Sequence, residues 1–261
     1  MKLATWNVNS IRARIDRLRP WLDAERPDVV CLQETKARDD VFPIDQLRAS
    51  GYRAAILGQR TYNGVAVLAR EELGEPRDVG FGFRDAGDDT QARFLDVRVG
   101  DLRVLCAYVP NGRAVGTEHF AFKLDWLDRV RRYLGEHCDP GEPLALCGDL
   151  NVAPEAIDVH DPAAWEGQVL FHPDERAALR RLLDWGLVDV VRASNPEPGL
   201  YSWWDYRMLA FPKNRGLRID HVFCTHPLAE RVSKARIDRE MRKVKDGKPP
   251  SDHAPVIVTI D

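Results

Sequence analysis

Four acidic residues lie at the edges of apolar, strand-like runs spread over the whole chain: Glu34, Asp149, Asp220 and Asp252. A carboxylate beside a buried strand costs free energy unless another group pairs with it. Several carboxylates at one sheet edge would instead form an oxygen-rich pocket that suits a hard divalent cation. The fold is therefore expected to bring these strand edges together, and the pattern predicts metal-assisted chemistry on a charged oxygen substrate.

Strand-like runs alternate with amphipathic helices. We expect strands at residues 2–8, 28–33, 52–58, 64–70, 91–99, 102–109, 144–148, 200–204, 218–224 and 254–260. Periodic apolar residues predict helices from about Ser10, over 117–137 and over 174–185. Pro20 predicts a kink or an early stop of the first helix near Arg19. Hairpins mixed with helical crossovers favour an α/β fold of two packed mixed sheets with helices outside, formed by residues 1–261 as one domain.

The order of strand and acid predicts one strand direction. Glu34 and Asp149 follow their strands, whereas Asp252 and His253 precede the last strand. For these groups to share an edge, the last strand must run antiparallel to the strands that end at 33 and 148.

Composition and cysteine use are typical of a globular cytoplasmic protein. The chain is 44% hydrophobic and 30% charged, and it shows neither a membrane-spanning apolar stretch nor a secretory signal. Of the five cysteines, four lie inside apolar runs, so we expect reduced core thiols. Zinc is not expected, because no cysteine pair has ligand spacing.

Charge is unevenly distributed although the net charge is only −3. Residues 231–248 hold eight basic and three acidic groups, and a second basic cluster comprises Arg12, Arg14, Arg17 and Arg19. Two interpretations remain open: a solvated helix face, or a surface that tracks phosphates around an acidic centre.

Two asparagines and a glutamate stand where the first two strands end. Glu34 is the first candidate for a direct metal ligand, because Mg²⁺ needs only one or two carboxylates besides water. The amides of Asn7 and Asn9 suit the orientation of a metal-bound water or of a neighbouring carboxylate. An ordinary strand-to-helix turn at the asparagines and a helix-start cap at Glu34 are the alternatives.

Asp149 and Asn151 are two residues apart, so their side chains point the same way in extended chain. Asp149 is suited to orient an attacking water or to accept its proton, and Asn151 to hold a phosphate or a carboxylate. An Asx-turn is the competing interpretation, and both can hold at once.

Asp220, Asp252 and His253 suggest an arrangement around an imidazole. A carboxylate that holds one imidazole nitrogen favours the imidazolium and leaves the other nitrogen to donate to a phosphate oxygen. Asp252 is also suited to bind the cation through water. A capping or surface pair of His and Asp is the alternative.

Uncharged donors and aromatic residues complete the candidates. Tyr108 and Asn111 follow an apolar strand and suit the stabilisation of a phosphorane-like transition state, although a buried tyrosine at a strand end explains the first equally well. In the aromatic run 201–207, alternation places Trp203 on the opposite face from Trp204, so one of them is free to line a pocket. Arg207 and Arg215 would then flank phosphates. Core packing is the alternative for the aromatic run.

Together these motifs resemble the exonuclease III family of abasic-site DNA-repair endonucleases. Nine segments in family order carry the resemblance: Trp-Asn-Val-Asn (6–9), Leu-Gln-Glu-Thr-Lys (32–36), Asn-Gly-Val-Ala-Val-Leu (63–68), Tyr-Val-Pro-Asn (108–111), Gly-Asp-Leu-Asn (148–151), Trp-Gly-Leu-Val-Asp (185–189), Tyr-Ser-Trp-Trp-Asp-Tyr-Arg (201–207), Gly-Leu-Arg-Ile-Asp (216–220) and Ser-Asp-His-Ala-Pro (251–255).

The resemblance implies a four-layered α/β sandwich with the site at one end of two sheets. It implies Mg²⁺- or Mn²⁺-dependent cleavage of duplex DNA 5′ to an abasic site, which leaves a 3′-hydroxyl. It also implies 3′-to-5′ exonuclease, 3′-phosphatase and 3′-phosphodiesterase activities at 3′ ends. We expect a monomer.

By position, the resemblance implies one role for each candidate. Glu34 ligates the metal with Asn7 and Asn9 beside it, and Asp252 lies near the metal or the leaving oxygen. Asp149, supported by Asn151, orients or activates water, and His253 with Asp220 contacts the scissile phosphate together with Tyr108 and Asn111. The apolar pocket for a flipped sugar is formed by Trp203, Leu217 and Ile219.

Two positions depart from the family pattern. Many members carry Asp where this chain has Asn9, and some carry an aromatic residue in place of Leu217. Two other classes of function are weighed: a fold relative acting on other phosphoesters, and a catalytically silent nucleic-acid-binding module. The aromatic run 201–207 joined to Asn214–Asp220 disfavours the first, and the intact set of acids and His253 disfavours the second.

Overall fold

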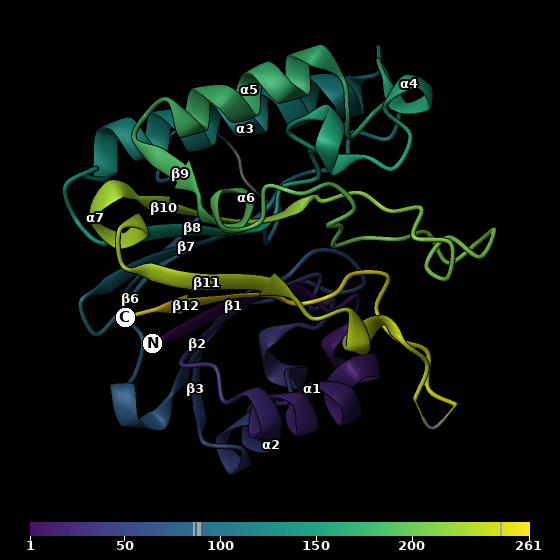
Figure 1. Ribbon diagram of the computed structural model, residues 1–261. Helices are drawn as coiled ribbons and strands as arrows, with labels where there is room; N and C mark the ends of the chain where they lie inside the picture. The colour runs from purple at the N-terminus through teal and green to yellow at the C-terminus, as the bar shows by residue number, and fades with distance from the viewer. Residues whose placement is uncertain (86, 88–89, 246) are drawn as a thin grey trace.

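Two six-stranded mixed sheets pack face to face, and helices cover both outer faces (Figure 1). The computed structural model describes residues 1–85, 87, 90–245 and 247–261; Asp246, one of the acids counted in 231–248, lies outside them. Helices α1 and α2 cover one sheet, and α3 and α5 cover the other. The expected four-layered α/β sandwich is confirmed.

The two sheets contain strands from distant parts of the chain. The first sheet has the order β11-β12-β1-β2-β4-β3, with β11 Val232–Ile237, β12 Val256–Ile260, β1 Lys2–Asn7, β2 Val29–Gln33, β4 Val65–Arg70 and β3 Tyr52–Leu57. The second has the order β5-β6-β7-β8-β10-β9, with β5 Arg77–Phe81, β6 Phe94–Val99, β7 Leu102–Tyr108, β8 Leu144–Asp149, β10 Asp220–Thr225 and β9 Leu187–Asp189.

The helices connect these strands. They are α1 Ile11–Glu25, α2 Ile44–Ala49, α3 Glu118–His137, α4 Pro162–Trp165, α5 Pro173–Leu183, α6 Val190–Ser194 and α7 His226–Ala229, with short 3-10 turns η1 Asp39–Val41, η2 Glu71–Leu73, η3 Ala156–Asp158 and η4 Arg239–Arg242. None of the helices in the described part of the chain is long and apolar enough to cross a membrane.

The predicted strand direction is confirmed for the first sheet. β12 pairs antiparallel with β1, and β1 pairs parallel with β2, so the last strand runs against the strand that precedes Glu34. The carboxyl end of β2 and the amino end of β12 therefore lie at one edge of the sheet.

Helix α1 begins as expected but ends later than Pro20 suggested. The Ser10 side chain accepts a hydrogen bond from the backbone N–H of Ala13, which caps the helix. The helix continues through Pro20 to Glu25, so the early stop at Arg19 is wrong. Pro20 lies on the exposed face, where water can satisfy the carbonyl that loses its intrahelical donor.

The expected strand at 200–204 is also wrong. Only Trp203 makes β-bridges there, to Leu217 and to His253, so the segment is a short cross-link between the two sheets. Conversely, β5, β9 and β11 were not expected. They are the edge or short strands of their sheets, and charged side chains interrupt the apolar alternation in β5 and β11.

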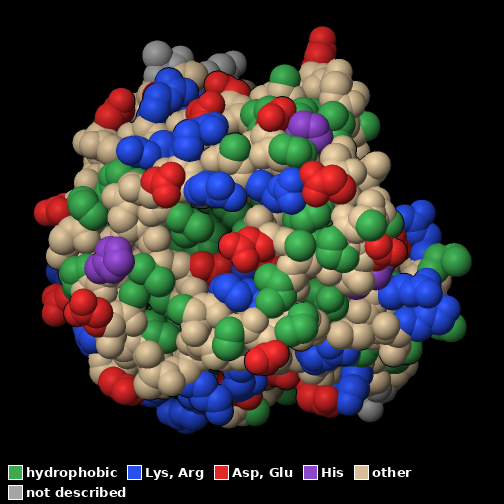
Figure 2. Space-filling model, turned by 45° about the horizontal axis from the view of Figure 1, so that its top comes forward, with side chains coloured by type: hydrophobic (Ala, Val, Ile, Leu, Met, Phe, Trp, Pro, Cys, Tyr) green, Lys and Arg blue, Asp and Glu red, His purple; other side chains and the backbone are tan. Residues whose placement is uncertain are grey.

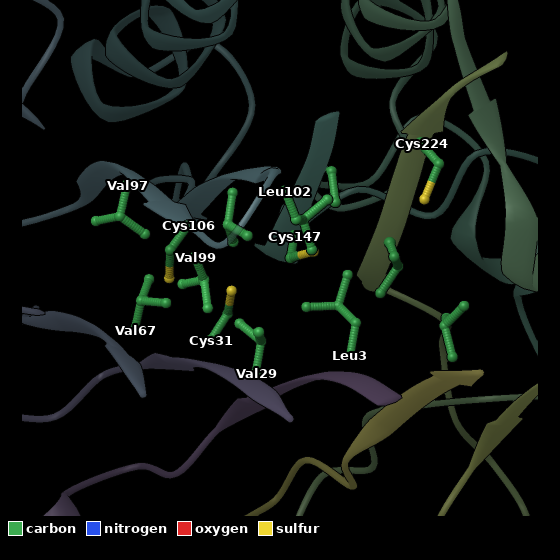
Figure 3. Packing of buried hydrophobic residues seen from close by; sticks show 14 of the residues in the cluster. Leu3, Val29, Cys31, Val67, Val97, Val99, Leu102, Cys106, Cys147 and Cys224 are labelled. Atoms are coloured by element: carbon green, nitrogen blue, oxygen red, sulfur yellow. The ribbon is translucent and has the colours of Figure 1, made fainter. Parts of the chain in front are cut away.

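The core between the sheets is apolar and contains most of the cysteines. Figure 3 shows Cys31, Cys106 and Cys147 pointing into the space between the sheets among valines and leucines. All five cysteines are free thiols, as expected, and Cys138 is the one that is partly exposed. Burial raises the pKa of the Cys31 and Cys106 thiols well above the usual range, so these core thiols stay protonated.

Candidate active site

The acidic strand edges of the two sheets meet at one end of the sandwich. The Asn7 side chain, at the end of β1, joins them: its amide donates to Glu34 Oε1 at 3.0 Å and to Asp149 Oδ2 at 2.9 Å. Glu34 follows β2 of the first sheet, and Asp149 ends β8 of the second. The predicted convergence of carboxylates is therefore present, and Asn7 orients two of them as its amide suggested.

A buried histidine lies between two aspartates. His253 Nδ1 is 2.8 Å from Asp220 Oδ2, and its Nε2 is 3.7 Å from Asp149 Oδ2. Ser202 Oγ also donates to Asp220 Oδ2, at 2.6 Å. Burial opposes the charged imidazole, but the charges of Asp220 and Asp149 outweigh it and raise the pKa of His253 to about 10. The histidine is therefore an imidazolium at neutral pH.

At Asp149, unlike at His253, burial has a larger effect on the pKa than the neighbouring charges. Asp149 is buried, and this burial raises its pKa to about 7, although the charge of His253 acts against the rise. Its Oδ1 accepts the backbone N–H of Asn151 at 3.0 Å, so the Asx-turn interpretation of this segment holds as well. Asp149 is thus held rigidly and titrates near the pH at which a general base is most effective.

Glu34 is surrounded by donors. Tyr108 OH donates to Glu34 Oε1 at 2.7 Å, and Lys36 Nζ lies 2.8 Å from Glu34 Oε2. Burial acts to raise the pKa of Glu34, but the charge of Lys36 together with the hydrogen bonds from Asn7, Lys36 and Tyr108 outweighs it and holds the pKa below its usual value. The Arg93 guanidinium stacks over the Tyr108 ring at 4.5 Å. Because its pKa is lowered, Glu34 is ionised at neutral pH.

Asn9 contacts Asp252 through its amide nitrogen and Lys36 through its amide oxygen. Asn9 Nδ2 donates to Asp252 Oδ1 at 2.9 Å, and Trp203 Nε1 donates to Asp252 Oδ2 at 3.0 Å. Trp204 is fully buried in a separate core cluster. The predicted opposite orientation of the two tryptophans is therefore observed, and Trp203 is the one that faces the site.

A buried lysine holds the loops that carry the two remaining asparagines. Lys123 Nζ donates to the backbone carbonyls of Asn111 and Asn151, at 3.1 and 2.6 Å, and pairs with Glu175. Asn111 Nδ2 in turn donates to Asn151 Oδ1 at 3.3 Å. Asn111 is exposed and Asn151 is buried, so the pair reaches from the interior to the surface.

The remaining predicted substrate-binding residues lie around Trp203. Leu217 and Ile219 are buried in an apolar cluster that Trp203 partly covers. Arg207 and Arg215 are exposed on the loop that follows the aromatic run, and the Arg207 guanidinium already pairs with Asp205 at 2.8 Å. Figure 1 shows this loop projecting from the same end of the sandwich as residues 239–245 and 247–250.

Sequence reasoning missed four residues with direct roles in this geometry: Lys36, Arg93, Lys123 and Ser202. Lys36 stands in the Leu-Gln-Glu-Thr-Lys segment, where its spacing from Glu34 was the available signal. The other three act on partners far along the chain, as Ser202 does on Asp220 and Lys123 on Asn151. No local pattern indicates such contacts.

The donor set fits a hard divalent cation. Glu34 and Asp252 are ionised carboxylates, since the pKa of each lies below its usual value; Asn7 donates to the first and Asn9 to the second through their amide nitrogens. A second group, Asp149, Asp220 and His253, has ligand atoms within 4.8 Å of one another. Asp220 Oδ1 there is buried without a hydrogen-bond partner in the described part of the chain. The Glu34 group offers carboxylate oxygens, whereas this second group includes an imidazole.

Basic side chains lie beside the site, and on the face of the molecule that Figure 2 draws they form separate clusters. Figure 2 shows Lys and Arg in several separate clusters with acidic side chains between them. An open depression of about 600 Å³ beside the site is lined by Arg12, Lys36 and Arg60. Arg17, by contrast, is buried and donates to the carbonyls of Met241 and Lys243. Among the described residues of 231–248, 232–237 form β11 and 239–242 form η4, so they do not make one solvated helix.

Comparison with known proteins identifies the family. The model of the endonuclease/exonuclease/phosphatase family matches residues 4–253. Exodeoxyribonuclease III of Haemophilus influenzae is 35% identical over 98% of this chain and 98% of its own length. This chain belongs to the exonuclease III family. As a member of that family it is a hydrolytic nuclease.

Solved structures of exonuclease III relatives share the whole fold. An AP endonuclease from Archaeoglobus fulgidus superposes with a TM-score of 0.94 at 38% identity, covering 100% of this chain and 99% of that one. A 3′ phosphatase from Neisseria, solved with a product DNA hairpin, superposes with a TM-score of 0.95 at 36% identity and the same coverage. The expected family, fold and class of enzyme are therefore confirmed.

Proposed function

We propose that this chain is an abasic-site endonuclease, which hydrolyses the phosphodiester 5′ to the lesion in duplex DNA and leaves a 3′-hydroxyl. At 3′ ends it also acts as a 3′-to-5′ exonuclease and removes 3′-phosphate and 3′-phosphodiester groups. The observation that carries the proposal is the buried group Asp149, His253 and Asp220, which Asn7 links to Glu34. One network of hydrogen bonds and ion pairs thus combines a candidate base (Asp149), an imidazolium (His253) and a candidate metal ligand (Glu34).

The cofactor we propose is Mg²⁺, for which Mn²⁺ substitutes. Glu34 would hold it, with Asp252 acting through water and the amides of Asn7 and Asn9 beside it. When bound, the divalent cation would neutralise negative charge on the phosphate and on the leaving oxygen. The chemistry of the carboxylate oxygens supports this assignment.

The protein's own groups supply the attack on phosphorus. Asp149 orients the water and takes its proton, because its raised pKa makes it basic near neutral pH. The His253 imidazolium, held by Asp220 at 2.8 Å, donates to a phosphate oxygen and stabilises the charge that develops there. Asn151 fixes Asp149 through its backbone N–H.

Uncharged donors complete the phosphate site. Burial, together with the charge of Glu34, raises the pKa of Tyr108 well above the usual range, so its phenol remains a donor at every working pH. Its hydroxyl donates to Glu34 in this structure, and with Asn111 it would supply an uncharged donor to the phosphate.

Lesion recognition is proposed for Trp203, Leu217 and Ile219. An abasic sugar has no base to unpair, so turning it out of the duplex costs less than turning out an intact nucleotide. The apolar cluster under Trp203 supports a pocket that accepts the bare sugar and excludes a base. Arg12, Arg60, Arg207 and Arg215 are the candidates for contacts with the DNA backbone.

The names of the relatives support these activities. The similar chains include an AP endonuclease, a 3′ phosphatase bound to a product DNA hairpin and a 3′-5′ exonuclease from Neisseria meningitidis. We further propose that the enzyme acts as a monomer and in the cytoplasm, where its buried thiols stay reduced.

A single oligonucleotide assay tests the proposal. A duplex with one tetrahydrofuran abasic analogue, labelled at the 5′ end, is incubated with Mg²⁺ and, in parallel, with EDTA; the matched control is the same duplex without the analogue. We expect incision 5′ to the analogue only when Mg²⁺ is present. Binding without incision would indicate a silent DNA-binding module, and equally fast cleavage of the control duplex would indicate a general nuclease.

A further inference from the structure

Lys36 occupies a position between two candidate metal ligands. Its Nζ lies 2.8 Å from Glu34 Oε2 and 2.7 Å from Asn9 Oδ1. Only 27% of the Lys36 side chain and 18% of the Glu34 side chain are exposed, so solvent screens this pair only in part. A positive group in contact with these two oxygens takes the place that a bound cation would take.

The other carboxylate oxygens of Glu34 and Asp252 already accept hydrogen bonds. Glu34 Oε1 accepts hydrogen bonds from Asn7 and Tyr108. Both oxygens of Asp252 accept bonds as well, from Asn9 and Trp203. Glu34 Oε2 is therefore the carboxylate oxygen that faces the Lys36 ammonium, and a cation that binds through this oxygen must share it with Lys36 or displace Lys36.

We propose that the Lys36 ammonium is a built-in competitor of the divalent cation, which holds Glu34 in the metal-free protein and lowers the affinity for metal. The proposal rests on the proposed function in one respect, that Glu34 is the metal ligand. Because Asn9 is neutral, it gives Lys36 an acceptor without adding a negative charge. The ammonium and the cation then face a single charged ligand, and their mutual repulsion disfavours simultaneous binding.

The competition links metal binding to substrate binding. Lys36 also lines the open depression with Arg12 and Arg60, so a phosphate there offers the displaced ammonium a new partner. DNA therefore draws the competitor away from Glu34, and the protein takes up its metal most tightly together with substrate.

The test measures metal binding without activity. Free Mn²⁺ is followed by electron paramagnetic resonance while it is titrated into the DNA-free protein. Lys36→Gln should bind Mn²⁺ at least about fivefold more tightly than the parent, because a charge a few ångströms from the cation is removed. Lys36→Arg keeps the charge and should stay within about twofold of the parent. Circular dichroism verifies that each variant is folded.

Arg38→Gln is the matched control, because Arg38 carries the same charge two residues away and pairs with the exposed Asp40 instead of Glu34. Its Mn²⁺ affinity should equal that of the parent. Equal tightening in Arg38→Gln and Lys36→Gln would overturn the proposal, since it would show a general charge effect. Unchanged or weaker binding by Lys36→Gln would overturn it as well.

Glu34→Gln separates this proposal from the assignment of the metal site. If Glu34→Gln weakens Mn²⁺ binding strongly while Lys36→Gln has no effect, the metal site stands and the competition is wrong. If Glu34→Gln binds Mn²⁺ like the parent, Glu34 is not the ligand, and both the proposed metal site and the competition are overturned.

Discussion

At Asp149, burial and neighbouring charge act in opposite directions on one carboxyl group. Burial raises the pKa to about 7, and the imidazolium of His253 limits the rise. Burial acts against the charge of His253, but the carboxylates of Asp220 and Asp149 raise its pKa to about 10, so it stays charged. A base and an acid whose pKa values are pushed apart by one shared environment are suited to take a proton from water and to stabilise a phosphate.

Removing either group should therefore affect the chemical step. We expect Asp149→Asn and His253→Ala each to lower kcat for the abasic duplex by at least roughly 10²-fold, because both act in the transition state. Single-turnover rates measure this. Asp128→Asn, which alters an exposed carboxylate on α3 paired with Arg181, is the control and should keep the parental rate. Near-normal turnover of a site variant would refute the role assigned to that residue.

A second histidine has the opposite charge state. His221 is buried and lies 3.1 Å from an Arg218 guanidinium nitrogen, and burial followed by the charge of Arg218 lowers its pKa to about 4. The unfolded chain, with a histidine pKa near 6.5, binds a proton between pH 6.5 and 4, whereas the folded protein does not. The stability linked to His221 is thus complete above about pH 6.5 and is lost as the pH falls towards 4.

Urea unfolding at several pH values checks this sign. Between pH 7 and 4 the parent should lose up to about 3 kcal/mol more unfolding free energy than His221→Gln does, which is the cost of one proton over that pKa difference. Parallel pH curves for the two proteins would contradict the prediction.

At the scale of elements, helices α3 and α5 position the two loops that carry Asn111 and Asn151. Lys123 on α3 and Glu175 on α5 are both fully buried, and the Lys123 ammonium also satisfies the carbonyls of Asn111 and Asn151. Glu175 in addition accepts the backbone N–H of His172 and caps α5. The outer helix layer therefore determines where the loops after β7 and β8 lie.

Breaking this buried pair should destabilise the protein. We expect Lys123→Met to cost about 3–5 kcal/mol of unfolding free energy, because it leaves the Glu175 charge buried without a partner. The double variant Lys123→Met/Glu175→Leu should recover most of that loss, yet its kcat should stay reduced because both loop carbonyls lack their donor. Chemical denaturation and single-turnover kinetics measure the two effects.

The exposed pair Arg181 and Asp128 joins the same two helices and is the control. Its side chains are about half exposed, so Arg181→Met should change stability by less than about 1 kcal/mol. Full recovery of kcat in the double variant would show that Lys123 has a structural role only.

At the scale of the whole molecule, two sheets bring together groups that no single sheet carries. Glu34 and His253 belong to the strand ends of the first sheet, and Asp149 and Asp220 to those of the second. The site therefore exists only when the sheets pack, and the network from Glu34 through Asn7 to Asp149 crosses that boundary. Loss of packing between the sheets should abolish activity before the strands themselves are lost.

The charge of the molecule as a whole makes one prediction about DNA. Net charge is −3, so binding to duplex DNA must depend on local Lys and Arg clusters rather than on overall attraction. We expect the logarithm of the association constant for the abasic duplex to fall linearly with the logarithm of the salt concentration. Fluorescence anisotropy in EDTA measures this constant. Arg60→Gln should reduce the slope by about one. A flat salt response would refute the backbone-contact surface.

Much of the site was predictable, and the reason differs between residues. The acids at strand edges and the opposite orientation of Trp203 and Trp204 follow from the period-two alternation of extended chain. The strand at 200–204 was wrong, because aromatic density indicates burial without indicating a ladder. Lys36 was visible in its motif but had no assigned role, since its direction depends on the turn at Glu34, whose φ is 51°.

The amino-acid sequence alone determined which chemical groups this protein possesses, on which strand edges they stand and to which family they belong, because local periodicity and short motifs are properties of neighbouring residues. Only the tertiary structure decided which groups meet: that Asn7 bridges the sheets, that Lys36 holds Glu34 and that Lys123 supports two loops. Such contacts depend on the spacing of packed layers and on side-chain direction, which no pattern along the chain encodes.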